Sequence, residues 1–169
     1  MAVKRKHHSA TAVLLIVWHS RTGASRALAE AAAAGAGARA RLLAAGDVQP
    51  EDLLAAQGYV FVCPENLAAM SGAMKEMFDS CYYPLLGRIE GRAYASMIAA
   101  GSDGHGAQAQ LDRIVTGWRL RRVAEQMIVK LHAQSAEEIM APKSVSDAIL
   151  MRARELGAAM ASGLEQGIF

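Results

Sequence analysis

Apolar runs and helical patterns alternate along this chain of 169 residues. Five short runs are rich in aliphatic or aromatic residues, and all but the second, which contains Arg39 and Arg41, are poor in charge. Such runs are typical of strands buried on both faces of a sheet. The runs are residues 12–18, 39–44, 59–63, 94–100 and 126–132. The pattern therefore predicts five strands, with Pro64 ending the third.

Between these runs, apolar residues recur at spacings of three and four, which predicts helices. The predicted helices are residues 23–34, 49–56, 71–83, 107–123 and 146–163. We expect Gly35 and Gly37 to break the first helix and Pro84 to close the third. Strands that alternate with helices through right-handed crossovers indicate a doubly wound α/β sandwich, with one parallel sheet covered by helices on both faces.

Composition is that of one domain with a mostly aliphatic core, since 53% of residues are apolar and only 5% are aromatic. We expect residues 12–169 to form this domain and residues 1–11 to be a disordered basic leader. The net charge is only +2 and no basic face continues into the domain, which argues against a nucleic-acid partner. The first apolar run is too short to cross a bilayer, which argues against a membrane partner.

The two cysteines, Cys63 and Cys81, have no metal-binding or CxxC spacing. Cys63 ends an apolar run and is expected to be a buried thiol. We expect no metal site, and the cytoplasm is the compartment that this cysteine usage favours.

The first strand leads directly into the sequence His-Ser-Arg-Thr-Gly-Ala-Ser, at residues 19–25, which opens a helix. The start of a helix has N–H groups without partners and a partial positive charge, and Gly23 allows a ligand to approach the backbone. This combination predicts an anion site, although the hydroxyl groups could instead only cap the helix. We expect His19 to pack or to form hydrogen bonds rather than to catalyse a reaction.

Two further loops follow the third and fourth strands, at residues 64–72 and 101–106. Ligands of parallel sheets bind at the carboxyl ends of the strands, so the three loops are expected to meet there. Residues 101–106 contain three glycines, and such a turn allows backbone amides to face a flat ligand. Together the loops predict a mononucleotide site.

These residues also carry a family resemblance. Residues 20–25, Ser-Arg-Thr-Gly-Ala-Ser, resemble the phosphate loop of flavodoxin-like proteins, which has the form Ser/Thr-x-Thr-Gly-x-Ser/Thr. Pro-Glu-Asn at 64–66, Met-Ser-Gly-Ala-Met-Lys at 70–75 and Asp79 are similar to the second loop and helix of flavodoxin-like NAD(P)H-dependent oxidoreductases. That group includes the FMN reductases and the quinone reductases of the tryptophan-repressor-binding-protein type. The resemblance spans residues 12–165 and implies a flavodoxin-like five-stranded parallel sheet in the order 2-1-3-4-5.

The resemblance implies FMN as cofactor and NAD(P)H as co-substrate. Electrons would pass to a quinone, free flavin or another small acceptor, and no side chain would act as a catalytic acid or base because the flavin N5 atom carries the hydride. At the phosphate the resemblance places Ser20, Thr22, Gly23, Ala24 and Ser25, with Arg21 as a further partner. Along the ring it places Pro64, Glu65, Asn66 and Leu67, and at the pyrimidine edge Gly101, Ser102, Asp103, Gly104 and His105.

Two other functions stay open. The chain could be an electron-transfer flavodoxin, or a flavodoxin-fold binding protein that has lost the flavin. Related sequences commonly carry aromatic residues near positions 67 and 69, where this chain has Leu67 and Ala69, and Asp103 adds a negative charge beside the ring. Apolar residues on the helix predicted at 71–83 favour a symmetric homodimer.

Overall fold

The protein, seen here in a computed structural model that describes residues 13–169, is built on one twisted sheet. The leader expected at residues 1–11 lies outside the described residues. Five parallel strands run in the order β2-β1-β3-β5-β7, which confirms the predicted order of the five strands. They are β1 (Leu14–Trp18), β2 (Ala40–Ala44), β3 (Gly58–Asn66), β5 (Ala93–Ala100) and β7 (Met127–Lys130).

Two short strands bring the sheet to seven strands and correct the predicted five. Strand β4 (Ala69–Met70) is antiparallel to the end of β3, and β6 (Arg121–Arg122) pairs with the start of β5. A strand of two residues is too short to show a periodic pattern in the sequence. It forms because the neighbouring strand supplies its hydrogen-bond partners. The α/β class of fold is as expected, and β4 and β6 only extend the predicted sheet.

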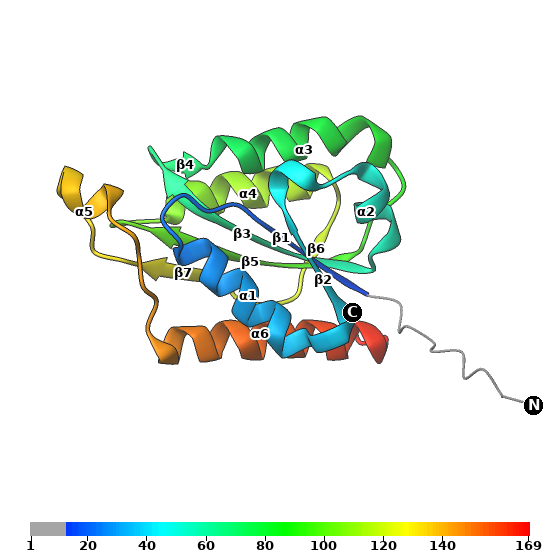
Figure 1. The fold of residues 1–169 in the computed structure, drawn as a ribbon. Coiled ribbons are helices and arrows are strands. Elements are labelled where there is room, and N and C mark those ends of the chain that lie inside the picture. The colour runs from blue at the N-terminus through cyan, green and yellow to red at the C-terminus, as the bar shows by residue number, and fades with distance from the viewer. Residues whose placement is uncertain (1–12) are drawn as a thin grey trace, which may run out of the picture.

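Helices cover both faces of the sheet and complete three layers (Figure 1). One face carries α2 (Pro50–Ala55), α3 (Gly72–Leu85) and α4 (His105–Gly117), and the other carries α1 (Ala24–Ala36) and α6 (Asp147–Glu165). The short helix α5 (Ala136–Met140) stands at the end of the sheet, and two 3-10 turns, η1 (Gly37–Arg39) and η2 (Ala45–Asp47), flank β2. Within residues 13–169, no helix combines the length and apolar character needed to cross a membrane.

Strand β1 shows why the apolar runs lack polar positions. Leu15 and Val17 pack into the cluster beneath α3 and α4, whereas Leu14 and Ile16 pack into the cluster beneath α1 and α6. All four side chains are at most 1% exposed. Both faces of the strand are therefore buried, as the sequence pattern indicates.

The predicted loop 64–72 is instead a β-hairpin. Strand β3 does not end at Pro64 but runs on to Asn66, and β4 returns beside it. At the tip, Leu67 and Ala68 have φ values of 52° and 60°, the left-handed pair that a two-residue hairpin turn requires. Because glycine and asparagine usually occupy such positions, Leu67 and Ala68 gave no sign of a turn.

Three predicted helix ends are also wrong. Gly35 does not break α1, which continues to Ala36 and ends at Gly37, whose φ is 63°. The third helix passes through Pro84 to Leu85. The fourth stops at Gly117 instead of residue 123, because the chain turns back there to add β6 to the sheet.

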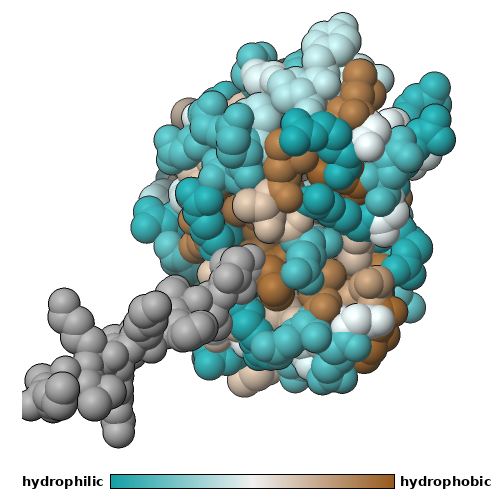
Figure 2. Space-filling model, turned by 90° about the vertical axis from the view of Figure 1, so that its right-hand side faces the viewer, coloured by the Kyte–Doolittle hydropathy of each residue, from teal (hydrophilic) through white to brown (hydrophobic). Residues whose placement is uncertain are grey.

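The face at the amino ends of the strands is predominantly hydrophilic, with hydrophobic residues in small groups among the polar ones (Figure 2). Such scattered apolar surface is ordinary for a folded domain. The carboxyl ends of the strands lie on the opposite side of the molecule (Figure 1), and the largest group of predicted site residues lines a cavity there.

Candidate functional site

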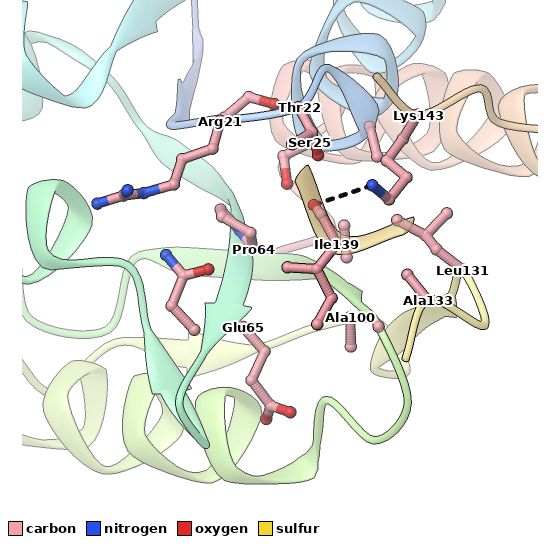
Figure 3. A pocket seen from close by; sticks show the side chains of 15 residues that line it. Arg21, Thr22, Ser25, Pro64, Glu65, Ala100, Leu131, Ala133, Ile139 and Lys143 are labelled. Carbon is pink, nitrogen blue, oxygen red and sulfur yellow. Dashed lines mark hydrogen bonds between the residues drawn. The ribbon is translucent and has the colours of Figure 1, made fainter. Parts of the chain in front are cut away.

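A pocket with about 580 Å³ of empty space opens where the carboxyl ends of β1, β3, β5 and β7 meet. This is the edge at which parallel sheets bind their ligands. The structure brings together the following predicted residues in its wall: Ser20, Arg21, Thr22, Ala24, Ser25, Pro64, Glu65, Asn66 and Gly101. Figure 3 shows that they come from segments far apart in the sequence.

One end of the pocket is formed by the start of α1. Gly23 precedes this helix with a φ of 103°, and its N–H donates to the Ser20 hydroxyl at 3.1 Å. Ser25 is 1% exposed, and among residues 13–169 its Oγ atom has no hydrogen-bond partner. A buried hydroxyl without a partner is costly, and here it lines a pocket beside free helix N–H groups. This end therefore fits an anion such as a phosphate.

Glu65 organises the other end of the pocket. Its carboxylate accepts hydrogen bonds from the N–H of Gly104 at 2.8 Å and from the N–H of Ala107 at 3.0 Å. Glu65 thereby caps α4 and joins it to the end of β3. The Gly104 N–H, which the sequence suggested would face a ligand, is directed at this carboxylate.

The glycines at the start of α4 have a packing role. A Cβ atom at Gly106 would lie 2.2 Å from the carbonyl oxygen of Ala68, so the hairpin tip approaches the helix closely only because residue 106 is glycine. Gly104 has a φ of 89°, which other residues rarely adopt. Gly106 therefore serves the contact between the hairpin and α4, and Gly104 serves the left-handed turn that begins the helix.

Some predicted site residues lie outside the pocket wall. Leu67 projects into solvent at the hairpin tip and is fully exposed. The wall also leaves out Gly23, Ser102, Asp103, Gly104 and His105. Of the glycine-rich loop, the wall contains only Gly101.

His19 hydrogen-bonds with its neighbour, as expected. Its Nδ1 atom lies 2.8 Å from the Oγ atom of Ser71, the residue that precedes α3. Burial lowers the pKa of His19 below its usual 6.5, and the positive charge of Arg21 lowers the pKa further. The neutral imidazole is therefore the form that this site favours.

The segment between β7 and α6 completes the pocket, and sequence reasoning missed it. It contributes Leu131, Ala133, Ile139 and Lys143 to the wall. A Ser-x-x-Glu capping box, Ser135 to Glu138, begins α5 and was a usable signal for that helix. No local pattern could show that this segment returns to the start of α1, since that depends on the tertiary fold.

The parallel sheet, its strand order and the helix start that follows β1 define a flavodoxin-like protein with a nucleotide pocket. Residues 47–133, just over half of the chain, match the model of the NADPH-dependent FMN reductase family, and the chain belongs to this family. It is thus an FMN-binding oxidoreductase, and the predicted cofactors, FMN with NAD(P)H as reductant, are confirmed at this level.

Solved structures show the same fold. A flavodoxin from the domain Archaea is 16% identical, with a TM-score of 0.72 over 90% of this chain and 98% of its own. A WrbA-like flavodoxin from Agrobacterium tumefaciens is 23% identical, with a TM-score of 0.67 over 90% and 97%. The Flv1 flavodiiron core from Synechocystis sp. PCC6803 is 17% identical, with a TM-score of 0.74 over 94% of this chain and 37% of its own. No curated protein sequence matches the chain.

Proposed function

We propose that this pocket binds FMN and that the protein passes electrons from NAD(P)H to a quinone, free flavin or another small acceptor. The observation that supports the position of the phosphate is the buried Ser25 hydroxyl at the start of α1, which has no hydrogen-bond partner among residues 13–169. FMN, when bound, supplies an N5 atom that takes a hydride from nicotinamide and returns electrons to the acceptor. The protein binds, orients and shields the reactants.

Each residue at the proposed phosphate end has a distinct task. Ser25 donates its hydroxyl hydrogen, while the helix N–H groups at Ala24 and Ser25 supply further donors. The Ser20 hydroxyl holds the Gly23 N–H, which sets the path of the loop. Thr22 adds a second hydroxyl, and Arg21 adds positive charge at the rim.

We assign the ring end to the end of β3 and to the loop after β5. Pro64, Glu65 and Asn66 would lie along the ring, with Leu67 at the exposed hairpin tip. Residues 101–105 would border the pyrimidine edge: Gly101 would line it directly, and Ser102, Asp103, Gly104 and His105 would approach it from outside the wall. In this proposal Glu65 is a positioning residue, because its hydrogen bonds to the Gly104 and Ala107 N–H groups hold the hairpin against α4.

Absorption spectroscopy and steady-state kinetics test this function. The purified protein, incubated with FMN and then dialysed, should retain a flavin spectrum. It should then oxidise NADPH or NADH with a quinone or free FMN as acceptor, and the ratio of kcat/KM values gives the preferred nucleotide. A protein that stays colourless contradicts the proposal, whereas one that binds FMN without oxidising either nucleotide is an electron carrier.

We also infer that residues 12–169 act as one flavodoxin-like domain in the cytoplasm, with residues 1–11 as a separate leader, and that two copies associate. Tyr83 and Leu86, at the end of α3, are 78% and 51% exposed and are candidates for a contact between copies. Gel filtration with light scattering should give the mass of a dimer.

A further inference from the structure

Lys143 lies at the phosphate end of the pocket although it is far from the phosphate loop in sequence. Its backbone N–H donates to the carbonyl oxygen of Thr22 at 2.7 Å. A Cβ atom at Gly23 would lie 3.5 Å from the Lys143 carbonyl oxygen, so residue 143 packs directly on the loop. Its side chain lines the same pocket as Ser25 and lies beside Thr22 and Ser25 in Figure 3.

Backbone carbonyl groups hold the Lys143 ammonium group in place. It donates to the carbonyl oxygens of Ala141 at 2.6 Å and Ile139 at 3.1 Å, and also to that of Glu138. These carbonyls belong to the last turn of α5 and to the residue that follows it, where a cation is favoured. They orient the ammonium group but do not cancel its charge.

No carboxylate within residues 13–169 lies within ion-pair distance of Lys143. Glu138, the acidic residue of α5 next to this segment, accepts hydrogen bonds from the N–H groups of Ser135 and Gln134, which lower its pKa, and the positive charge of Lys143 lowers that pKa further. The other cation of the pocket wall, Arg21, extends away from Ser25 (Figure 3). Of these two cations of the pocket wall, Lys143 is therefore the one whose side chain stays on the side of Thr22 and Ser25 (Figure 3).

We propose that Lys143 selects for the phosphate of the ligand, so that the pocket distinguishes FMN from riboflavin. This inference rests on the proposed function, in which α1 and Ser25 receive that phosphate. The three N–H groups of the ammonium all donate to these carbonyls, so its charge acts on the ligand through space. A fixed unit charge in a partly buried pocket attracts a dianionic phosphate, whereas neutral riboflavin gains nothing from it. The charge acts at the phosphate end alone, so contacts with the ring are unaffected.

Titration of the apo-protein with FMN and with riboflavin, followed by quenching of flavin fluorescence, tests this role. Lys143→Met should weaken FMN binding by at least about tenfold. Its riboflavin affinity should equal that of the wild type. Lys143→Arg, which keeps the charge, should bind FMN nearly as the wild type does. Lys130→Met is the matched control, because Lys130 is exposed on β7 and absent from the pocket wall.

Each outcome bears on one conclusion. An equal loss of FMN and riboflavin affinity in Lys143→Met would mean that the residue only supports α5, and would overturn the inference. Unchanged binding of both flavins in that variant would also overturn it, as would an equal loss in Lys130→Met. A wild-type protein that binds neither flavin would overturn the proposed function and this inference with it. Circular dichroism of the apo-variants verifies that each is folded.

Discussion

At the scale of single residues, the Ser25 hydroxyl is expected to lower the stability of the apo-protein and to strengthen its binding of FMN. Its buried hydroxyl has no partner among the described residues, and an unsatisfied buried hydroxyl typically costs about 1–3 kcal/mol. We therefore expect Ser25→Ala to raise the free energy of unfolding of the apo-protein by about 1 kcal/mol. The same variant should weaken FMN binding by about tenfold, because a donor to the phosphate is lost.

Urea unfolding of the apo-protein and FMN titration measure these two effects. Ser80→Ala is the control, since Ser80 is exposed on α3 and bonds only to Glu76. It should change neither quantity. If Ser25→Ala lowered both stability and affinity, the hydroxyl would have a structural partner and the assignment of the phosphate site would be wrong.

The lowered pKa of His19 predicts how the free energy of unfolding depends on pH. Its pKa in the folded protein lies below the usual 6.5, so the unfolded chain takes up a proton first as the pH falls. The stabilising contribution of neutral His19 is complete above about pH 6.5 and is lost as the pH falls through the folded-state pKa. His19→Gln should therefore show a flatter decline in unfolding free energy between about pH 7 and pH 5.

Chemical denaturation at several pH values measures that slope. Identical slopes in His19→Gln and the wild type would show that another group causes the pH dependence.

At the scale of secondary-structure elements, glycines determine how closely α1 and α6 approach. A Cβ atom at Gly157 would lie 1.9 Å from the carbonyl oxygen of Ala32, and one at Gly35 would lie 1.9 Å from that of Arg154. Both close contacts involve backbone, which cannot rotate away as a side chain can. The two helices thus pack through small residues on both sides, and the alanine-rich sequence of α1 serves the same contact.

Gly157→Ala should therefore destabilise the protein by about 1–3 kcal/mol, because the helices must move apart. The usual effect of this substitution inside a helix is a gain of about 0.5–1 kcal/mol. Gly117→Ala is the control, since a Cβ there meets nothing within 4 Å, and it should be neutral or stabilising. Thermal unfolding followed by circular dichroism compares them, and a Gly157→Ala variant as stable as wild type would contradict the close packing.

At the scale of the whole molecule, ligand binding should couple to global stability. The pocket wall draws on the ends of four strands and on the segment between β7 and α6, so an occupied pocket is possible only in the folded chain. At a hundred times its Kd, FMN should add about 2.7 kcal/mol to the free energy of unfolding. For a domain of this size that corresponds to a rise in Tm of about 5–11 °C.

Differential scanning fluorimetry at increasing FMN concentration measures this rise, and it should disappear when the flavin is removed by dialysis against chaotropic salt. Riboflavin at the same concentration should raise Tm by less, since it lacks the phosphate. A Tm that is independent of FMN concentration would contradict binding to the native pocket.

The order of the main strands and the helix start at Gly23 could be predicted from local pattern and family resemblance. Buried strands, helical periodicity and a Ser/Thr/Gly loop each depend on residues that are adjacent in sequence. The hairpin at Leu67 and Ala68 could not be predicted, because tertiary contact holds these residues in a conformation that their own preferences disfavour. The predicted helix break at Gly35 is wrong for a related reason, because this glycine allows close contact with α6 and does not interrupt α1.

The features of the pocket also fall into two groups, those that a short segment of sequence reveals and those that only the fold brings together. Its phosphate loop is visible in the sequence because one short segment carries the hydroxyls, the glycine and the helix start. Three further facts depend on segments distant in sequence: Glu65 accepts a hydrogen bond from the Gly104 N–H, Ser25 has no partner in the described part of the chain, and Lys143 bonds to Thr22. Local chemistry sufficed to propose an anion site, whereas only the return of the segment between β7 and α6 to this loop decided that Lys143 lines the same pocket.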